Sequence, residues 1–391
     1  MTDDARPSGP LDGLVVADFS RILAGPYATM LMADMGAEVI KVESPGGDDT
    51  RTWVPPTRDG VSTYYLSINR NKRSIALDLR DPADLEVARE IAARADVLIE
   101  NFKPGGLAKY GLDHASVSAV NPGIVYASIS GFGSGGGAHL PGYDLMVQAI
   151  SGLMSLTGSP DGQPFRAGIS VFDVVTGMHA LIGILSALHE RAASGVGQHV
   201  EVNLLSSALS GLVNQTAAYV AGGAVPSRMG NAHPSLFPYE PLPASDGDII
   251  VIAGNDRQFA TLCDALGAPH LAEDPRFATV GDRTANREEL RPLLVERLGE
   301  RTRAEWFDLL IKAGVPAGPI NTVAEGVEFA DGLGLRPVVE VGEGDAAVPL
   351  VRNPLTFSRS GIRYDLPPPR VGEHSDEVRA WLDGLAERGD A

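Results

Sequence analysis

The chain has 391 residues, of which 44% are hydrophobic and 21% are charged, and it carries a formal net charge of −18. This length predicts two domains, and the acidity argues against binding of nucleic acid over a broad electrostatic surface. The single cysteine, Cys263, excludes an intramolecular disulfide framework and a cysteine-cluster zinc site. Because the chain lacks both a run of about 18 apolar residues and the residue order of a signal peptide, we expect a cytoplasmic protein that does not enter a membrane.

The N-terminal residues show the pattern of a strand, a helix and a second strand. The apolar runs 14–17 and 39–42 predict two short buried strands. Between them, Pro26 fits the first turn of a helix that stops near Gly36. The alternation continues with a helix over 85–95 and strands over 97–100 and 124–130. Such alternation predicts an α/β fold with a parallel, doubly wound sheet.

The rest of the chain divides at a segment rich in Gly and Pro. A long helix is predicted from about Val174 to Arg191, followed by a strand-like run over 199–205 and a further helix to about Ala221. We therefore predict a large domain over 1–221, a linker over 222–245, a small α+β domain over 246–325, and a β-like, Pro-broken segment over 326–391.

A glycine loop follows the strand at 124–130. Gly131, Gly133 and Gly136 fit the pattern G-x-G-x-x-G, which in dinucleotide-binding proteins opens a helix that binds the pyrophosphate. Here Pro141-Gly142 follows and breaks any helix. The sequence therefore favours a glycine loop beside a site over a dinucleotide site.

Basic residues are concentrated near the ends of the predicted strands, where parallel sheets bind ligands. They are Arg21, Lys41, Arg51, Arg70, Lys72, Arg73, Lys103 and Lys109. They indicate either a site for a phosphate-bearing ligand or a set of solvated surface charges. No histidine spacing typical of a metal site and no G-x-S-x-G nucleophile motif is present.

Asp173 lies directly before the long helix predicted from about Val174. An aspartate in this place is commonly the N-cap of the helix, although a capping box is missing because Thr176 stands at the N3 position. A carboxylate there can also be a nucleophile at the mouth of a site. The local sequence leaves both interpretations open.

A set of motifs covers nearly the whole chain in order. It comprises DFSRILAGPYATMLMADMGAEVIKVESPGGDDTR, NRNKRSIALDLR, ADVLIENFKPGGLAKYGL, NPGIVYASISGFG, GYDLMVQAISG, DVVTGMHALIGILSAL, GQHVEVNLL, GNAHPSLFPYEP and GEHSDEV. In this combination the chain resembles the class III CoA-transferases, the family of formyl-CoA transferase and carnitine CoA-transferase, which also includes α-methylacyl-CoA racemase.

The resemblance implies that Asp173, which opens a D-x-x-x-G stretch ending at Gly177, is the nucleophile. Its carboxylate would attack an acyl-CoA thioester and form a mixed anhydride, which the released CoA thiolate would convert into an enzyme-bound thioester. The chemistry implies no permanently bound cofactor and no metal, with coenzyme A as substrate and product. Dicarboxylate substrates such as succinyl-CoA are common in the family.

The resemblance also implies where CoA binds. Leu23 and Ala24 match positions near the pantetheine and thioester, and Gly133 belongs to the glycine loop expected to help bind the oxyanion. The positions expected to bind CoA elsewhere are Arg21, Lys72, Arg73, Asn101, Phe102, Lys109 and Tyr110. Relatives often have Arg in place of Lys109.

Tyr143 distinguishes the activities within the family. Racemases carry Gly-His-Asp where this chain has Gly142-Tyr143-Asp144, and a phenol with an unperturbed pKa near 10 is a poor proton shuttle at neutral pH. We therefore expect a transferase in which Tyr143 positions the substrate. A racemase and a CoA-binding protein without turnover remain the alternatives.

The family fold implies a large Rossmann-like domain built from both chain ends, so that 326–391 would return to it. It also implies a homodimer of interlocked subunits. The expected partners are acyl-CoA, carboxylic acids and a second copy of the chain, and not nucleic acid or a membrane.

Overall fold

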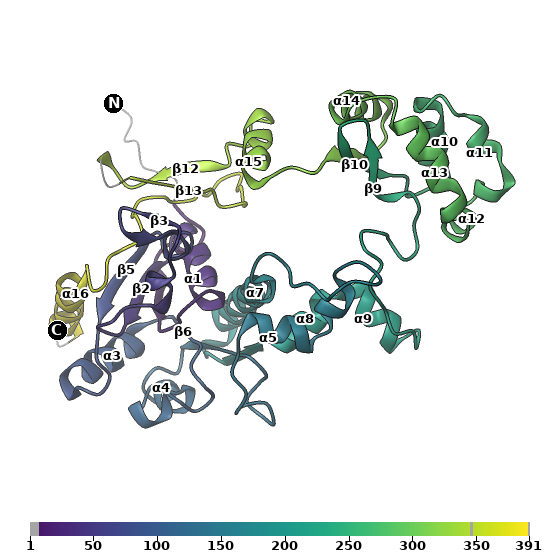
Figure 1. Ribbon diagram of the computed structural model, residues 1–391. Helices are drawn as coiled ribbons and strands as arrows, with labels where there is room; N and C mark the ends of the chain where they lie inside the picture. Colours follow the sequence, from purple (N-terminus) through teal and green to yellow (C-terminus); the bar gives the residue numbers. More distant parts are fainter. Residues whose placement is uncertain (1–7, 345–346, 390–391) are drawn as a thin grey trace. The chain divides into compact units, whose positions relative to one another are not determined.

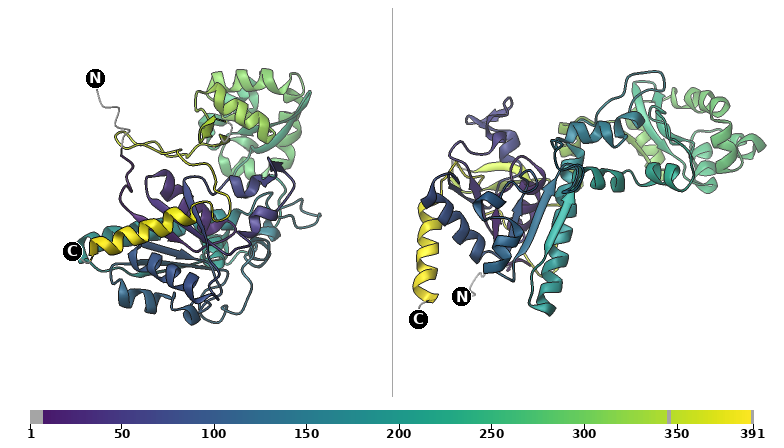
Figure 2. Two further views of the ribbon diagram at one scale, coloured as in Figure 1. Left: turned by 90° about the vertical axis from the view of Figure 1, so that its left-hand side faces the viewer. Right: turned by 90° about the horizontal axis from the view of Figure 1, so that it is seen from below.

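The computed structural model describes residues 8–344 and 347–389, which form two compact units (Figures 1 and 2). The first unit runs to Leu153, resumes over Ala167–Ala224 and continues from Arg336. The second unit comprises Met154–Arg166 and Val225–Leu335.

The first unit contains a six-stranded sheet in the order β5-β2-β1-β6-β7-β8, with every strand parallel to its neighbours. The strands are β1 (Val15–Asp18), β2 (Glu38–Glu43), β5 (Lys72–Ala76), β6 (Val97–Glu100), β7 (Val125–Ser130) and β8 (His199–Asn203). The predicted parallel sheet is therefore confirmed. The order reverses direction between β1 and β6, and ligands bind at such a switch point in open α/β sheets.

Helices cover both faces of this sheet. They are α1 (Ala24–Asp34), α3 (Pro82–Arg94), α4 (His114–Val120), α5 (Asp144–Ile150), α7 (Val171–Ser194), α8 (Leu204–Gly211) and α16 (Ser375–Gly389), while α9 (Val213–Val220) continues from α8 and has no buried residue. Shorter elements are η1 (Asp49–Thr52), β3 (Thr57–Arg58), β4 (Val61–Ser62), α2 (Thr63–Leu66), η2 (Ala108–Tyr110), β12 (Val338–Val341) and β13 (Val348–Val351), and α6 (Leu153–Leu156) begins at the last residue before the second unit.

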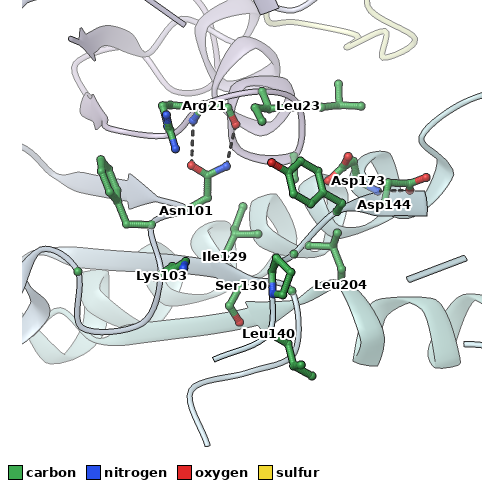
Figure 3. Close-up of a pocket in the computed structure, with 18 of the residues that line it drawn as sticks. Arg21, Leu23, Asn101, Lys103, Ile129, Ser130, Leu140, Asp144, Asp173 and Leu204 are labelled. Atoms are coloured by element: carbon green, nitrogen blue, oxygen red, sulfur yellow. Dashed lines mark hydrogen bonds between the residues drawn. The ribbon is translucent and has the colours of Figure 1, made fainter. Parts of the chain in front are cut away.

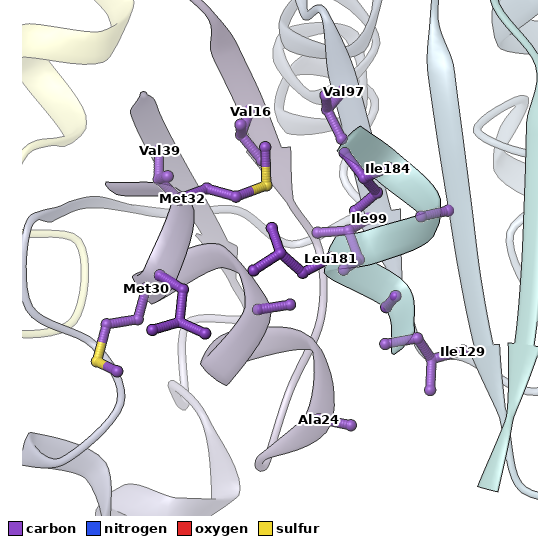
Figure 4. Packing of buried hydrophobic residues seen from close by; sticks show 14 of the residues in the cluster. Val16, Ala24, Met30, Met32, Val39, Val97, Ile99, Ile129, Leu181 and Ile184 are labelled. Carbon is purple, nitrogen blue, oxygen red and sulfur yellow. The ribbon is translucent and has the colours of Figure 1, made fainter. Parts of the chain in front are cut away.

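The alternation of side chains along the strands produces two hydrophobic cores, one on each face. Val16 and Val97 pack with α1 and α7, where Leu181 and Ile184 are buried (Figure 4). Residues one position along the strands, such as Ala17 and Leu98, pack with α3, α4 and α16 on the other face.

The second unit has its own core around an antiparallel three-stranded sheet in the order β11-β10-β9. Its elements are β9 (Tyr239–Ala244), β10 (Gly247–Ile252), α10 (Asp256–Ala265), α11 (His270–Glu273), η3 (Pro275–Phe277), α12 (Val280–Ala285), α13 (Arg287–Leu298), α14 (Arg303–Ala313), β11 (Ala317–Pro319) and α15 (Val323–Gly332).

The units divide at residues that differ from the predicted domain limits. Strand β9 lies inside the segment 222–245, which the Gly and Pro content predicted to be a linker. Its prolines are compatible with a strand because β9 is at the edge of its sheet, where one side of the backbone needs no partner. The segment Met154–Arg166 also belongs to the second unit, and no local pattern indicates this.

Helix α7 begins at Val171, three residues before the predicted start. Judged by length and composition alone, it is the one helix among the described residues that is long and apolar enough to cross a membrane. Such a helix is weak evidence for a membrane span, and Phe172, Ala180 and Ile184 of α7 are buried in the core of the first unit.

Candidate active site

A cavity of about 620 Å³ opens in the first unit at the carboxyl ends of the parallel strands. Its lining includes Arg21–Ala24 after β1, the loop after β6, the end of β7 and the first turn of α7. Figure 3 shows Asp173 and Asp144 side by side, with Arg21, Asn101 and Lys103 farther along the cavity. Acidic and basic side chains therefore occupy different parts of one site.

Asp173 is the third residue of α7 and is not its N-cap. The N-cap position is Ser170, whose side chain makes no capping hydrogen bond within the described residues. Instead, the Asp144 carboxylate accepts the backbone N–H of Phe172 at 2.8 Å and that of Asp173 at 3.2 Å. Asp144 thus satisfies the free amides of this helix end, as a capping side chain does, and leaves Asp173 available to the cavity.

Burial, together with the neighbouring negative charge of Asp144, raises the pKa of Asp173 to about 7. Desolvation and a like charge both disfavour the ionised form of a carboxyl group. A pKa shift of this size is common at functional sites. When it is ionised, Asp173 is a poorly solvated carboxylate, which makes it more basic than an exposed aspartate.

Gly177 explains how α7 can approach α1. A Cβ atom at Gly177 would lie 2.5 Å from the backbone oxygen of Ala24, closer than such atoms approach in proteins. Gly177 follows Asp173 by one helical turn and lies on the same side of α7. The glycine of the D-x-x-x-G stretch therefore allows the start of α1 to lie beside Asp173.

The residues at the start of α1 lie at the cavity as predicted. Leu23 and Ala24 line it, and no side chain among the described residues caps α1. The first backbone amides of a helix lack intrahelical acceptors and carry partial positive charge. They are suited to a developing negative charge on a bound ligand.

Most of the predicted CoA-binding residues lie at the same cavity. Arg21, Asn101, Phe102, Lys109 and Tyr110 line it. The Asn101 side chain accepts the N–H of Arg21 at 2.9 Å and donates to its backbone oxygen at 2.7 Å. A second cavity of about 300 Å³ shares Arg21, Phe102 and Tyr110 with the first. The two cavities therefore lie side by side, and cationic side chains such as Arg21 and Lys109 line them.

Lys72 and Arg73, which the resemblance assigns to CoA binding, are not among the residues that line either cavity. Lys72 is fully buried, and its ammonium group donates to Asp18 at 3.1 Å and to the backbone oxygen of Pro26 at 2.9 Å. Arg73 lies on the opposite face of β5 and pairs with Glu38. Successive side chains of a strand point to opposite faces, so these two residues could not share one phosphate.

The glycine loop contributes through residues other than Gly133. The cavity is lined by Gly131 and Gly142, whose backbones are so close that a Cβ at Gly131 would lie 2.4 Å from the Cα of Gly142. Gly133 has a φ of 81° and is not among the lining residues, although its N–H donates to the hydroxyl of Ser130, which does line the cavity. The predicted Tyr143 does line the cavity and is 61% exposed.

Sequence reasoning missed Asp144, Ser170 and Tyr64, which also line the cavity. Burial raises the pKa of Tyr64, and its hydroxyl hydrogen bonds to Ser170. Asp144 is 29 positions from Asp173 in the chain, so no local motif connects them. Its one signal was its place in the Gly142-Tyr143-Asp144 segment of the family motifs.

Comparison with known proteins identifies the family. The model of CoA-transferase family III matches residues 11–375. A succinate–glutarate CoA-transferase of Agrobacterium fabrum is 44% identical, over 98% of this chain and 98% of that protein. A succinyl-CoA:glutarate CoA-transferase of Mus musculus is 40% identical, over 98% of this chain and 90% of its own length.

A solved structure agrees with this assignment. The crystal structure of a CAIB/BAIF family protein from Brucella suis matches with a TM-score of 0.86 and 46% identity, and covers 96% of this chain and 100% of that one. The match extends over both units, and the resemblance inferred from the motifs is confirmed. The chain belongs to CoA-transferase family III and is an enzyme that moves CoA from an acyl-CoA thioester to a carboxylic acid.

Proposed function

We propose that Asp173 is the nucleophile of this CoA-transferase. The observation that carries the proposal is its position: a carboxylate with a pKa raised to about 7 lies in the large cavity, in the first turn of α7, where Asp144 and not Asp173 satisfies the helix amides. A poorly solvated carboxylate beside the positive end of α1 is suited to attack a thioester.

The reaction needs four balanced steps. An Asp173 oxygen attacks the thioester carbonyl, the C–S bond breaks, and CoA leaves as a thiolate from a mixed anhydride. The thiolate then attacks the carboxyl carbon of Asp173 and releases the donor acid. The acceptor carboxylate attacks this aspartyl thioester to form a second anhydride and releases the thiolate again. Finally the thiolate attacks the acceptor acyl group and restores Asp173.

Each step passes through a tetrahedral oxyanion, which hydrogen-bond donors fixed in advance can stabilise. We assign this role to backbone amides at Leu23 and Ala24, because both residues line the cavity and the start of α1 carries no side-chain cap within the described residues. The close approach of Gly177 to the Ala24 oxygen supports this assignment, since it brings the two helix ends together.

CoA would occupy both connected cavities. Its thioester lies at Asp173, its pantetheine passes between Leu23 and the Asn101–Phe102 segment, and its nucleotide end enters the second cavity. Arg21, Lys103 and Lys109 of the first cavity and Arg80 of the second are then among the cations available to its phosphates. This arrangement assigns no phosphate contact to Lys72 or Arg73.

We propose short dicarboxylic acids as substrates, with succinyl-CoA as a donor. The names of the Agrobacterium and mouse relatives include succinate or succinyl-CoA together with glutarate. The choice of acceptor is tested by a panel of acids that differ in chain length and in the number of carboxylates.

The active protein is proposed to be an interlocked homodimer. In the first unit, α7, α8 and α9 expose large apolar side chains, among them Ile182 at 61%, Tyr219 at 62% and Val220 at 75%. Apolar patches of this kind often mark protein contacts. Sedimentation should give a dimer, and Val220→Glu should shift the chain toward monomer. A wild-type monomer with full activity would contradict the proposal.

Trapping of the enzyme-bound thioester tests the nucleophile. The protein is incubated with succinyl-CoA, quenched in acid and digested with trypsin, which should release residues 167–191 as one peptide. We expect this peptide to carry the mass of CoA less one water, and hydroxylamine should convert the thioester into a hydroxamate on Asp173.

Two variants serve as controls for this experiment. Asp173→Asn should form no adduct and lose transfer activity, whereas Asp144→Asn keeps the Asp173 carboxylate and should still form the adduct. Full transfer activity in Asp173→Asn would refute the covalent mechanism. An adduct on another peptide would assign the nucleophile elsewhere.

A further inference from the structure

The segment that joins β1 to α1 contains a strained residue next to the active site. Ile22 has a φ of 71°, in the left-handed region that β-branched residues rarely adopt. The two residues that follow, Leu23 and Ala24, line the cavity with Asp173. Left-handed backbone at a non-glycine residue persists only where the surroundings hold it, so the contacts of Ile22 are informative.

Asp48 holds Ile22 in this conformation. The Ile22 N–H donates to both oxygens of the Asp48 carboxylate, at 3.3 and 3.2 Å. The same carboxylate accepts the backbone N–H of Thr50 at 3.0 Å, the Thr50 hydroxyl at 2.7 Å and the Lys41 ammonium group at 2.9 Å. Asp48 is 2% exposed, and the pairing with Lys41 keeps its pKa low despite its burial.

The residues before Ile22 are held as well. Asn101 makes two hydrogen bonds with the backbone of Arg21. The backbone oxygen of Ser20 accepts from the Lys41 ammonium group at 3.2 Å, and its N–H donates to Asp18 at 3.0 Å. Every residue from Ser20 to Ile22 is thus held by a buried charge or by Asn101, and Asp48 is the contact at the strained position.

We propose that Asp48 is a positioning residue for the transfer reaction: its buried carboxylate keeps Ile22 in the left-handed conformation and thereby fixes the amides of Leu23 and Ala24 at the site. The inference rests on the proposed function of those amides. Oxyanion donors act only when they are fixed at the right distance before the reaction, and a displacement of about 1 Å can cost about 100-fold in rate.

An amide in place of the carboxylate should release the strain. Asp48→Asn keeps the size of the side chain, but it removes the charge that pairs with Lys41. Its NH₂ group would face donors from Ile22 and Thr50 in one orientation, and donors from Ile22 and Lys41 in the other. Ile22 is then expected to return to an ordinary negative φ, which moves the backbone of Leu23 and Ala24.

A double-mutant cycle tests this coupling. Asp48→Asn should lower kcat about 10- to 100-fold, because the oxyanion donors shift, and change the KM for acyl-CoA by less than about threefold. Glycine adopts a φ of 71° without strain. In an Ile22→Gly background, Asp48→Asn should therefore lower kcat by less than about threefold, a coupling that contacts of this kind can show. In an Ile22→Val background the full loss should persist.

Asp34→Asn is the matched control for the loss of a buried charge. Asp34 is fully buried and pairs with Arg70 at 2.6 Å at the opposite end of α1. This variant should unfold at a lower temperature and keep the kcat of the wild type. If Asp48→Asn behaves in the same way, or if its loss of kcat is equal in all three backgrounds at residue 22, the proposal is wrong.

Two further measurements complete the test. If Asp48→Asn does not fold, the cycle uses Thr50→Val, which removes one donor to Asp48. A loss of kcat that is smaller in the Ile22→Gly background than in the wild-type background supports the proposal. An equal loss in the two backgrounds contradicts it. Asp173→Asn is assayed in parallel. Retained transfer there would refute the proposed function, whereas an inactive Asp173→Asn with no coupling between residues 22 and 48 would refute only the role of Asp48.

Discussion

At the scale of single residues, the site depends on two carboxyl groups with different roles. The Asp144 side chain accepts the backbone N–H groups of Phe172 and Asp173 and the amide of the Gln148 side chain. Asp173 has no comparable set of hydrogen-bond donors to its side chain among the described residues, and its pKa is raised to about 7. One carboxylate therefore organises the helix end, and the other is left reactive.

The pH dependence of the reaction should report the ionisation of Asp173. Because the carboxylate is the proposed nucleophile, kcat/KM for acyl-CoA should rise with pH and level off above about 7. Asp144→Asn removes the neighbouring charge, and its amide oxygen can still accept the two N–H groups. The rise should then move to lower pH by roughly one unit, because burial, the larger cause of the shift, remains.

Removal of a negative charge elsewhere controls for a general effect of net charge. Asp376→Asn changes an exposed residue of α16 and should leave the pH profile in place. If Asp144→Asn gives the profile of the wild type, Asp144 does not set the pKa of Asp173.

The same pKa has a consequence for stability. The folded protein binds the proton of Asp173 more tightly than the unfolded chain does, so ionisation of this residue destabilises the fold as pH rises from about 4 to about 7. Asp173→Asn removes this penalty. It should raise the free energy of unfolding at pH 8 by about 2–4 kcal/mol, since one pKa unit corresponds to about 1.4 kcal/mol.

At pH 4 the carboxyl group is protonated in the folded protein and about half protonated in the unfolded chain, so Asp173→Asn should change the free energy of unfolding there by less than about 1 kcal/mol. Denaturant unfolding of the wild type and the variant at the two pH values measures the difference. An equal gain at both values would show that packing, and not ionisation, is responsible.

The proposed role of Asp173 rests on motifs along the whole chain, which do not predict its position. Its place as the third residue of α7 depends on Asp144, which the fold brings in from another helix. Lys72 shows the same limit. The pattern around it indicated a basic cluster, but which face of β5 carries the lysine depends on the packing of α1 over the sheet.

At the scale of elements, the site is formed where two helices begin. α1 follows the central strand β1 at its carboxyl end, beside the point where the strand order reverses. α7 packs against α1 in the core (Figure 4). Strands β1, β2, β6 and β7 were predicted because their apolar runs are short and continuous, and β8 was predicted as a strand-like run, whereas β5 (Lys72–Ala76) was not predicted because it begins with charged residues. The distance between α1 and α7 was not predictable, because it depends on a single glycine, Gly177.

Gly177→Ala tests this close approach. A methyl group would lie 2.5 Å from the Ala24 oxygen, and the two helices would have to separate. We expect a loss of about 1–3 kcal/mol in the free energy of unfolding, as for other overpacked positions, together with a lower kcat. Thermal unfolding and steady-state kinetics measure the two effects.

Gly326 is the matched control. It lies inside α15, and nothing is within 4 Å of the position of an added Cβ. Gly326→Ala should stabilise the protein by about 0.5–1 kcal/mol through helix propensity alone. A gain of similar size in Gly177→Ala would show that α1 and α7 can separate freely and that the glycine has no role in the site.

At the scale of the whole molecule, the first unit is assembled from distant parts of the chain. Helix α16 packs on the face of the sheet opposite α1 and α7, where Val378 and Leu382 are buried with Ala88 and Ile91 of α3. Arg379 also pairs with Asp84 at 2.9 Å. The local sequence of α16 predicts an amphipathic helix but does not identify the strand that it covers, so its assignment to the large domain came from the family resemblance alone.

Leu382→Ala tests whether this last helix stabilises the unit that contains the site. Leu382 is 3% exposed, and the loss of such a side chain from a core typically costs about 2–5 kcal/mol. Asp383→Ala, at the exposed neighbouring position, should change the free energy of unfolding by less than about 0.5 kcal/mol. Both variants should keep their kcat at temperatures well below unfolding. α16 lies on the opposite face of the sheet from α7, which carries Asp173, and it affects the site only by stabilising the folded unit. A Leu382→Ala protein as stable as the Asp383→Ala protein would mean that the helix does not belong to the cooperative core, and the carboxyl end of the chain would then have no part in maintaining the active site.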